Sequence, residues 1–261
     1  MPKTPATAAN RPIDAFQRLS IDTADGTGEV LATRIADKLR AAITRGEVTP
    51  GSRMRLEELR TTLGVSFSPL REALSRLDAE GFVVAENQRG YRVAPVSEQN
   101  LREITQIRLA LEPMALRESI ISGDGDWEGG VVAAFHQLTQ HPSRRARPGA
   151  CESSEFEKWE RAHRAFHQSL LSGCRMPILF QFCLTLYDLS DRYRRLYLSR
   201  RPTPDRAVTG EHKRIAEAAI ARDADAASRL LHGHIERVSA RVLQSLSEQP
   251  PAGKSRPARR A

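Results

Sequence analysis

The sequence predicts a mainly α-helical protein with an N-terminal winged helix-turn-helix and a C-terminal all-α bundle of six helices. Three observations predict this fold class. Residues 56–80 hold two short runs of leucines at helical spacing, separated by a glycine and a short turn. Two β-like runs joined by a polar link follow at once. From residue 98 to residue 246, apolar residues recur at helical spacing with no convincing strand pattern.

The helix-turn-helix is recognised by its start and stop signals. Gly64 follows the first run of leucines, where a glycine commonly ends a helix. After the turn we predict Ser68 as the N-cap of the second helix, with Pro69 in the first helical turn. Gly81 stops that helix. A helix from about residue 29 to residue 45 precedes the pair and supports it.

A hairpin follows the second helix. Residues 82–84 and 91–93 read as short strands, and residues 85–90 between them are polar, with an arginine and a glycine at the tip. Such a hairpin can lie along the edge of a DNA groove beside a recognition helix. A helix-turn-helix with this wing is a more specific indication of DNA binding than a helical hairpin alone.

The stretch PGSRMRLEELRTTLGVSFSPLREALSRLDAEGFVVAENQRGYRV resembles the winged helix-turn-helix of GntR-type bacterial transcription regulators. The blocks PG-x-R, LGVS, PLREAL-x-RL, EGFV and RGY-x-V carry the resemblance. It implies binding to a double-stranded DNA operator as a homodimer. One position departs from the family, because Phe67 stands where an Arg commonly meets bases or phosphates. We therefore expect this chain to dock on DNA as the family does, but to prefer a different operator sequence.

The expected DNA contacts lie on the turn, the second helix and the wing. Arg71 is the candidate base-reading side chain, since it faces the groove near the start of the second helix. Three further arginines are expected to clamp phosphates, on the segment before the first helix and on the wing. The full set of expected DNA-contacting residues is Arg53, Arg55, Ser66, Phe67, Ser68, Arg71, Arg89 and Gly90.

Composition bounds the class of protein. The 261 residues suffice for two modest domains, and 40% hydrophobic with 28% charged residues is typical of a globular protein. The net charge of +8 favours an anionic partner, nucleic acid first. We expect no membrane span and no secretory signal, because no long apolar run is present. Cys151, Cys174 and Cys183 form no CxxC pair and are expected as reduced thiols in a cytoplasm.

These patterns divide the chain into segments. The expected segments are a disordered arm (1–27), the winged helix-turn-helix (28–94), a linker (95–97), a helical effector and metal domain (98–246) and a basic disordered tail (247–261). Ser97 is the expected N-cap of a helix over residues 98–122. The inner side of that helix is expected to carry Leu101, Ile104, Ile107, Leu111, Met114 and Leu116. The other helices are expected near residues 127–140, 152–172, 176–199, 205–221 and 224–246.

Four histidines of the helical domain form a candidate metal site. His163 and His167 are four residues apart, so one helix face can offer two imidazoles to one metal. His212 and His234 each lie 11 residues from the turn at Asp223, so an antiparallel hairpin brings them to the same height. His232, two residues from His234, leaves the helix on another face.

The helical segment is also similar to a known domain, the FCD ligand-binding domain of FadR-like GntR regulators. The matching pieces are Ile107-Arg108-x-x-Leu111-Glu112, Phe166-His167, Glu211-His212 and Asp223-Ala224-x-Ala226-Ala227 running to His234. The resemblance implies a divalent metal held by an Asp and three His, and His167, His212 and His234 fall on the three His positions. His163 stands at the Asp position. Gly173-Cys174 replaces the usual Gly-Asn.

Four neutral imidazoles suit Zn²⁺, Ni²⁺ or Cu²⁺ better than Mg²⁺, Ca²⁺ or Mn²⁺, and Zn²⁺ or Ni²⁺ is the expected ion. Two arrangements stay open: all four histidines coordinate, or His163 stands aside and three histidines leave an open position. The uncompensated charge of the ion would attract an anionic ligand, such as a small organic acid. Arg108 is the candidate partner for its carboxylate, and a structural ion pair with a bundle Glu is the equal alternative.

The sequence therefore predicts a DNA-binding transcription regulator, a repressor that responds to a small carboxylate. A metal-dependent enzyme on the bundle is one alternative class. It is disfavoured because no general base stands out beside the four histidines: Glu211 adjoins His212, and a helical neighbour at that spacing points away. A constitutive architectural DNA binder is the other alternative. Metal content and ligand-dependent DNA release distinguish the three.

Overall fold

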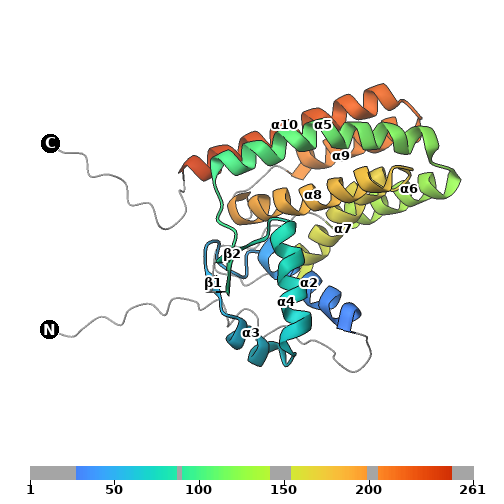
Figure 1. The fold of residues 1–261 in the computed structure, drawn as a ribbon. Helices are drawn as coiled ribbons and strands as arrows, with labels where there is room; N and C mark the ends of the chain where they lie inside the picture. Colours follow the sequence, from blue (N-terminus) through green and yellow to red (C-terminus); the bar gives the residue numbers. More distant parts are fainter. Residues whose placement is uncertain (1–27, 87–89, 142–153, 199–204, 249–261) are drawn as a thin grey trace, which may run out of the picture. The chain divides into compact units, whose positions relative to one another are not determined.

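The structure is a computed structural model that describes residues 28–86, 90–141, 154–198 and 205–248. Figure 1 shows its helices and strands. The chain divides into two compact units, Met1–Val96 and Ser97–Ala261. The expected arm over 1–27 and all but two residues of the expected tail over 247–261 lie outside the described residues.

The first unit is a winged helix-turn-helix. Apolar side chains from its helices and from Phe82 fill a closed core, in which Leu39, Leu70 and Leu74 have no exposed surface. Its elements are α2 (Gly28–Thr44), β1 (Arg53–Met54), α3 (Leu56–Leu63), α4 (Phe67–Ala79), β2 (Val83–Glu86) and β3 (Gly90–Val93).

The sheet of this unit contains a strand that the sequence did not predict. Its order is β1-β3-β2, with both pairs antiparallel. Strand β1 places Arg53 opposite Arg92 and Met54 opposite Tyr91. Two residues are too few to show an alternating pattern, so only the pairing with β3 reveals β1 as a strand.

The start of the second helix of the helix-turn-helix corrects the predicted N-cap. Gly64 ends α3 in the left-handed conformation with φ 65°, as predicted. Helix α4 begins at Phe67, and Ser66 rather than Ser68 is the extended residue before it, with φ −82° and ψ 166°. Pro69 is then the third helical residue. It is tolerated there because the first backbone N–H groups of a helix have no intrahelical acceptor.

The second unit is an all-α bundle with six helices among the described residues. Ser97 caps the first of them, since its side chain accepts a hydrogen bond from the Asn100 backbone N–H at 3.1 Å. The last helix continues to Glu248, so the predicted start of a disordered tail at residue 247 is wrong. The helices are α5 (Glu98–Ser122), α6 (Gly125–Gln140), α7 (Ser154–Leu171), α8 (Pro177–Leu198), α9 (Asp205–Ile220) and α10 (Ala224–Glu248).

The buried face of α5 differs from the predicted one. Ile107 and Met114, which were expected inside, are 41% and 49% exposed. Arg108 and Glu112 are buried instead, at 6% and 2% exposure. The prediction placed the apolar residues inside, and it missed that two opposite charges one turn apart can be buried as a pair.

No helix of the described chain is long and apolar enough to cross a membrane.

Trp127 closes one end of the bundle. Its indole N–H donates to the Ser169 carbonyl oxygen at 3.0 Å, and the Arg222 guanidinium lies 4.9 Å from its ring centroid. A Cβ added at Gly173 would lie 2.8 Å from the Ser119 carbonyl oxygen and 2.9 Å from Trp127 Cδ1. The glycine therefore lets the chain between α7 and α8 pass directly against α5 and α6.

We expect Gly173→Ala to destabilise the protein by about 1–3 kcal/mol, because the added methyl group overpacks a site bounded by backbone and a large ring. Gly130→Ala is the matched control. Nothing lies within 4 Å of an added Cβ at Gly130 inside α6, so alanine should stabilise that helix by up to about 1 kcal/mol. Urea denaturation followed by circular dichroism measures both changes. Equal midpoints for Gly173→Ala and the wild type would contradict this account.

Candidate metal centre and nucleic-acid interface

Three helices bring four histidines together in the core of the bundle. His163 and His167 come from α7, His212 from α9 and His234 from α10. One nitrogen from each imidazole can be chosen so that all four atoms lie within 4.8 Å of one another. The rings of His212 and His234 have centroids 4.8 Å apart, which agrees with the equal heights inferred from the hairpin turn.

All four side chains are buried, with at most 5% of each residue exposed. Burial lowers the pKa of His163, His167 and His212 well below the usual value, and the neighbouring imidazoles and Arg194 lower it further. These three imidazoles are therefore neutral at pH 7. The neutral form carries the lone pair that binds a metal ion.

The hydrogen bonds around the cluster fit a metal-binding role. Tyr187 Oη lies 3.0 Å from His163 Nδ1, and Glu211 Oε2 lies 2.7 Å from His234 Nδ1. Partners on Nδ1 leave Nε2 of these two rings for a ligand, as in many metal sites. His167 Nε2 and His212 Nε2 are buried with no hydrogen-bond partner. Unpartnered buried nitrogens are costly unless something binds them, so the four residues fit a bound cation.

Glu211 belongs to this site, contrary to the sequence-based argument. It does point away from His212, its neighbour in the chain, but it reaches across the α9–α10 hairpin to His234. Arg237 Nε donates to its other oxygen at 2.7 Å. The hydrogen bond with His234 lowers the pKa of Glu211 to about 2, with a smaller contribution from Arg237. Counting residues from the turn at Asp223 placed His212 and His234 at the same height. The same count, applied to Glu211, would have predicted that this residue also lies close to His234.

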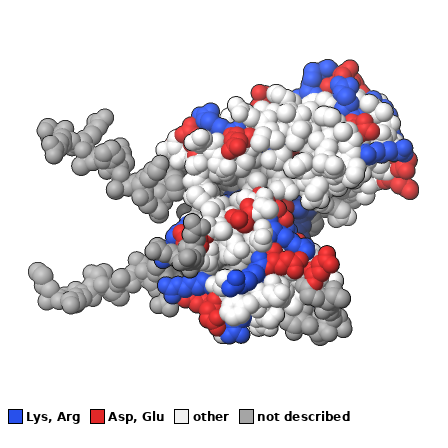
Figure 2. Space-filling view, in the orientation of Figure 1, with Lys and Arg blue, Asp and Glu red and all other residues white. Residues whose placement is uncertain are grey.

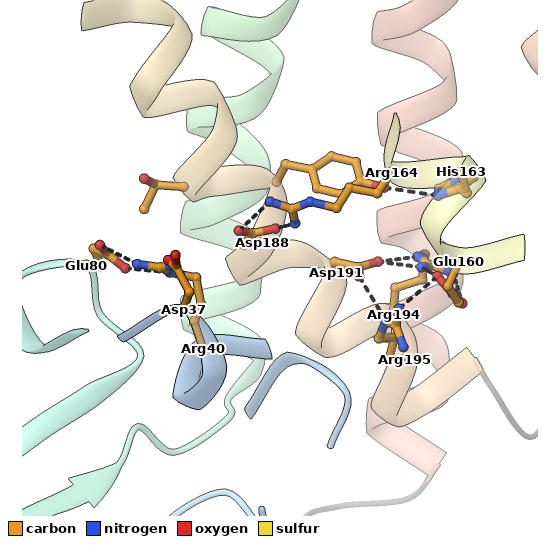
Figure 3. Close-up of polar contacts among 12 residues, drawn as sticks. Asp37, Arg40, Glu80, Glu160, His163, Arg164, Asp188, Asp191, Arg194 and Arg195 are labelled. Carbon is orange, nitrogen blue, oxygen red and sulfur yellow. Dashed lines mark hydrogen bonds and ion pairs between the residues drawn. The ribbon is translucent and has the colours of Figure 1, made fainter. Parts of the chain in front are cut away.

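A network of buried charges lies beside His163. The Trp159 ring stacks on the His163 ring with centroids 4.7 Å apart, and the Arg194 guanidinium lies 5.6 Å from the Trp159 ring centroid. Figure 3 shows Arg194 between Glu160 and Asp191, to which it donates hydrogen bonds. Glu160 is thus engaged in ion pairs and does not face the imidazoles as a free base.

Arg108 takes the second of the two roles left open for it. Its guanidinium donates to Glu112 Oε2 at 3.2 Å and to Ser190 Oγ at 2.7 Å, so it forms a buried ion pair. It also lies 5.6 Å from the Tyr187 ring centroid. Its charge contributes to the lowered pKa of His167, so it is close to the cluster. Glu112 and Tyr187 are functional-site candidates that the sequence analysis did not name.

The described residues that were expected to contact DNA all belong to the first unit. Of the described ones, Arg53, Arg55, Ser66, Phe67, Ser68 and Arg71 are exposed. Arg53 pairs with Glu86 at 3.5 Å and Arg55 with Glu58 at 3.0 Å. Gly90 has φ 91°, and a Cβ there would lie 3.0 Å from the Met54 carbonyl oxygen, so only glycine fits. Arg89 lies outside the described residues.

The Phe67 ring lies close to two arginines. The guanidinium carbons of Arg60 and Arg71 are 5.2 Å and 5.9 Å from its ring centroid. The ring is 40% exposed. A cation close to an aromatic face is attracted by the ring quadrupole. The Phe67 ring therefore helps to hold the guanidinium groups of Arg60 and Arg71 near the exposed start of α4.

A winged helix-turn-helix joined to a helical domain with a buried histidine cluster defines a DNA-binding transcription regulator. Residues 31–93 match the model of bacterial regulatory proteins of the gntR family, and residues 103–237 match the FCD domain. The chain belongs to the GntR family and carries an FCD domain. Its relatives are transcription regulators rather than enzymes.

Two relatives illustrate this membership. The uncharacterized HTH-type transcriptional regulator BphR of Paraburkholderia xenovorans (strain LB400) is 39% identical over 76% of this chain and 80% of its own. The HTH-type transcriptional repressor GlaR of Escherichia coli (strain K12) is 35% identical over 76% of this chain and 89% of its own. The structure of E. coli McbR/YncC is similar in fold, with a TM-score of 0.69 and 21% identity over 82% of this chain and 97% of that one.

We expect Arg71→Ala to weaken binding to the specific operator by more than about 1 kcal/mol, because a good base contact is lost. Arg102→Ala is the matched control. It removes an exposed arginine of α5 that pairs only with Glu98 among the described contacts, so operator affinity should stay within twofold. Fluorescence anisotropy titrations with the operator and with a scrambled duplex measure both. Normal operator binding by Arg71→Ala would mean that α4 is placed wrongly on the DNA.

Proposed function

We propose that this regulator is a repressor that acts in the cytoplasm as a homodimer and releases its operator when a small carboxylate metabolite binds the FCD domain. The 35% identical relative GlaR is described as a repressor, which supports the direction of regulation. The match to the gntR family model supports the homodimer, because helix-turn-helix regulators commonly read two half-sites as symmetric dimers.

The observation that carries the proposal is the cluster of His163, His167, His212 and His234. We propose that these four residues hold a divalent transition metal, Zn²⁺ or Ni²⁺ rather than Mg²⁺ or Ca²⁺, because imidazole ligands suit the former. The unpartnered Nε2 atoms of His167 and His212 support this assignment. A bound ion supplies a +2 charge that neutral imidazoles leave uncompensated.

The surroundings of the cluster support an anionic effector. The positive charges of Arg108 and Arg194 both act on His167, and the cluster itself contains no carboxylate. Glu112 pairs with Arg108, and Glu160 and Asp191 pair with Arg194. The net positive charge that a carboxylate effector would meet therefore comes from the bound ion. The effector carboxylate would compete with Glu112 for the Arg108 guanidinium. Arg108 is therefore part of the proposed effector site.

The release of DNA tests this part of the proposal. Small mono- and dicarboxylates are titrated into the protein–operator complex, once with zinc-loaded protein and once after chelation. At least one carboxylate should dissociate the zinc-loaded complex at a concentration that leaves the chelated complex intact. If no carboxylate releases the operator from zinc-loaded protein, the effector class is wrong, whereas the metal site is judged separately below.

Purified protein should carry close to one Zn²⁺ or Ni²⁺ per chain, and His167→Ala, His212→Ala and His234→Ala should each lose it. Elemental analysis measures this. His232→Ala is the matched control, because that imidazole is exposed and pairs with Glu236 on the outside of α10. Metal-free native protein whose melting temperature does not rise on adding Zn²⁺ or Ni²⁺ would exclude the site.

His163 separates the two arrangements left open by the sequence. If it coordinates, His163→Asp should keep a metal and shift the preference toward Mn²⁺, which favours oxygen ligands. If it stands aside, His163→Ala should leave the metal content unchanged.

Glu211→Gln should weaken zinc affinity roughly 10–100-fold, because a neutral amide replaces the carboxylate that orients His234 and raises its basicity. Competition with a chromophoric chelator measures the affinity. Glu236→Gln removes a carboxylate beside the exposed His232 and should leave the affinity unchanged. Equal affinities of the two variants would show that Glu211 plays no part in metal binding.

A further inference from the structure

An aromatic residue stands at the exposed start of α4. Phe67 is the first residue of that helix and is 40% exposed. Side chains of a helix lean toward its N-terminus, so the ring lies at the end of the helix whose residues contact base edges in DNA. The core of this unit closes without the ring, since Leu70 and Leu74 of the same helix have no exposed surface. The apolar surface of Phe67 is therefore available to a bound duplex.

Two arginines restrain this ring. The guanidinium carbon of Arg71, four residues further along α4, lies 5.9 Å from the ring centroid, and that of Arg60 of α3 lies 5.2 Å from it. Arg60 also pairs with Glu57 at 2.7 Å, which holds its guanidinium on α3. A ring that is held before binding loses less conformational freedom when DNA docks, so its contact contributes more to affinity.

The charges of this unit do not by themselves select a DNA sequence. Figure 2 shows Lys and Arg side chains interspersed with Asp and Glu over the first unit. Contacts from such arginines to phosphates fix the position of the protein on the duplex but carry no sequence information. Discrimination among bases therefore depends on side chains at the start of α4 that can reach base edges.

A phenyl ring can discriminate among bases in one way. It has no strong hydrogen-bond donor or acceptor, so a polar base edge that packs against it loses water without compensation. In the major groove, thymine alone among the four bases presents a methyl group. We propose that the Phe67 ring reads the 5-methyl group of a thymine in each operator half-site.

Arg71 gives the position of that thymine. Phe67 and Arg71 are four residues apart and lie on one face of α4. One turn of a helix rises about 5.4 Å, so the two side chains reach base pairs within one or two steps of each other. A guanidinium donates best to O6 and N7 of guanine, so the thymine should lie near a guanine. Thymine reading rests on the DNA-binding class of the chain and is independent of the proposed metal and effector.

Deoxyuridine in place of thymine tests the contact, because it lacks the methyl group and keeps every hydrogen-bonding group. The operator of the full-length protein is first selected from random duplexes, and each thymine of a half-site is then replaced in turn. One replacement should weaken binding by the wild type about fourfold, the factor expected for one buried methyl group. Phe67→Ala should bind that duplex and the thymine duplex equally in fluorescence anisotropy titrations.

Val30→Ala is the matched control, because Val30 is similarly exposed at 43% on α2; it should keep the fourfold preference for thymine. Phe67→Arg should select guanine in place of that thymine, since its guanidinium can donate to O6 and N7. Circular dichroism checks that each variant is folded.

Three results would each overturn thymine reading by Phe67. The first is a wild type that selects no thymine, or that binds every deoxyuridine duplex as tightly as its operator. The second is a Phe67→Ala variant that keeps the fourfold preference. The third is a Phe67→Arg variant that selects the same thymine as the wild type.

Discussion

The helical domain depends on keeping four imidazoles inside an apolar bundle. Burial lowers the pKa of His163, His167 and His212, so these three imidazoles remain neutral and keep lone pairs that can bind a metal ion. Tyr187 and Glu211 form hydrogen bonds with two of the eight ring nitrogens, and one nitrogen from each ring can be chosen so that all four lie within 4.8 Å of one another. Apolar packing of helices α7, α9 and α10 cannot supply a partner for the buried imidazole nitrogens that have no hydrogen bond, such as His167 Nε2 and His212 Nε2. A cation among these nitrogens would join three helices from distant parts of the chain into one unit.

The sequence predicted the parts of this structure that follow from local period and spacing. The helices, the cap at Ser97 and the level of His212 with His234 needed only residue counts. It failed where a residue acts across elements. Glu211 was dismissed because it faces away from its neighbour His212, and Ile107 was placed inside because it fits the apolar spacing of its helix. Such contacts depend on which helices pack against each other. The periodicity of a single helix does not contain that information.

In the DNA-binding unit, an aromatic residue replaces an expected arginine, and two neighbouring arginines keep positive charge close to that position. Phe67 stands where the family resemblance led us to expect an arginine, and the guanidinium groups of Arg60 and Arg71 lie 5.2 Å and 5.9 Å from its ring centroid. Positive charge therefore remains at the start of α4, but it is supplied by flanking residues. The aromatic ring close to them adds an apolar surface at the position where a groove would be read.

The stacking of Trp159 on His163 gives this protein an optical property. The chain has two tryptophans, Trp127 at the closed end of the bundle and Trp159 in contact with the cluster. Only the Trp159 indole emits from beside an imidazole of the cluster, so the intrinsic fluorescence of a Trp127→Phe protein would come from that one location. An open-shell ion such as Ni²⁺ at the cluster would quench this emission, whereas closed-shell Zn²⁺ would leave it bright. The identity of the ion can thus be followed by light in the unlabelled protein.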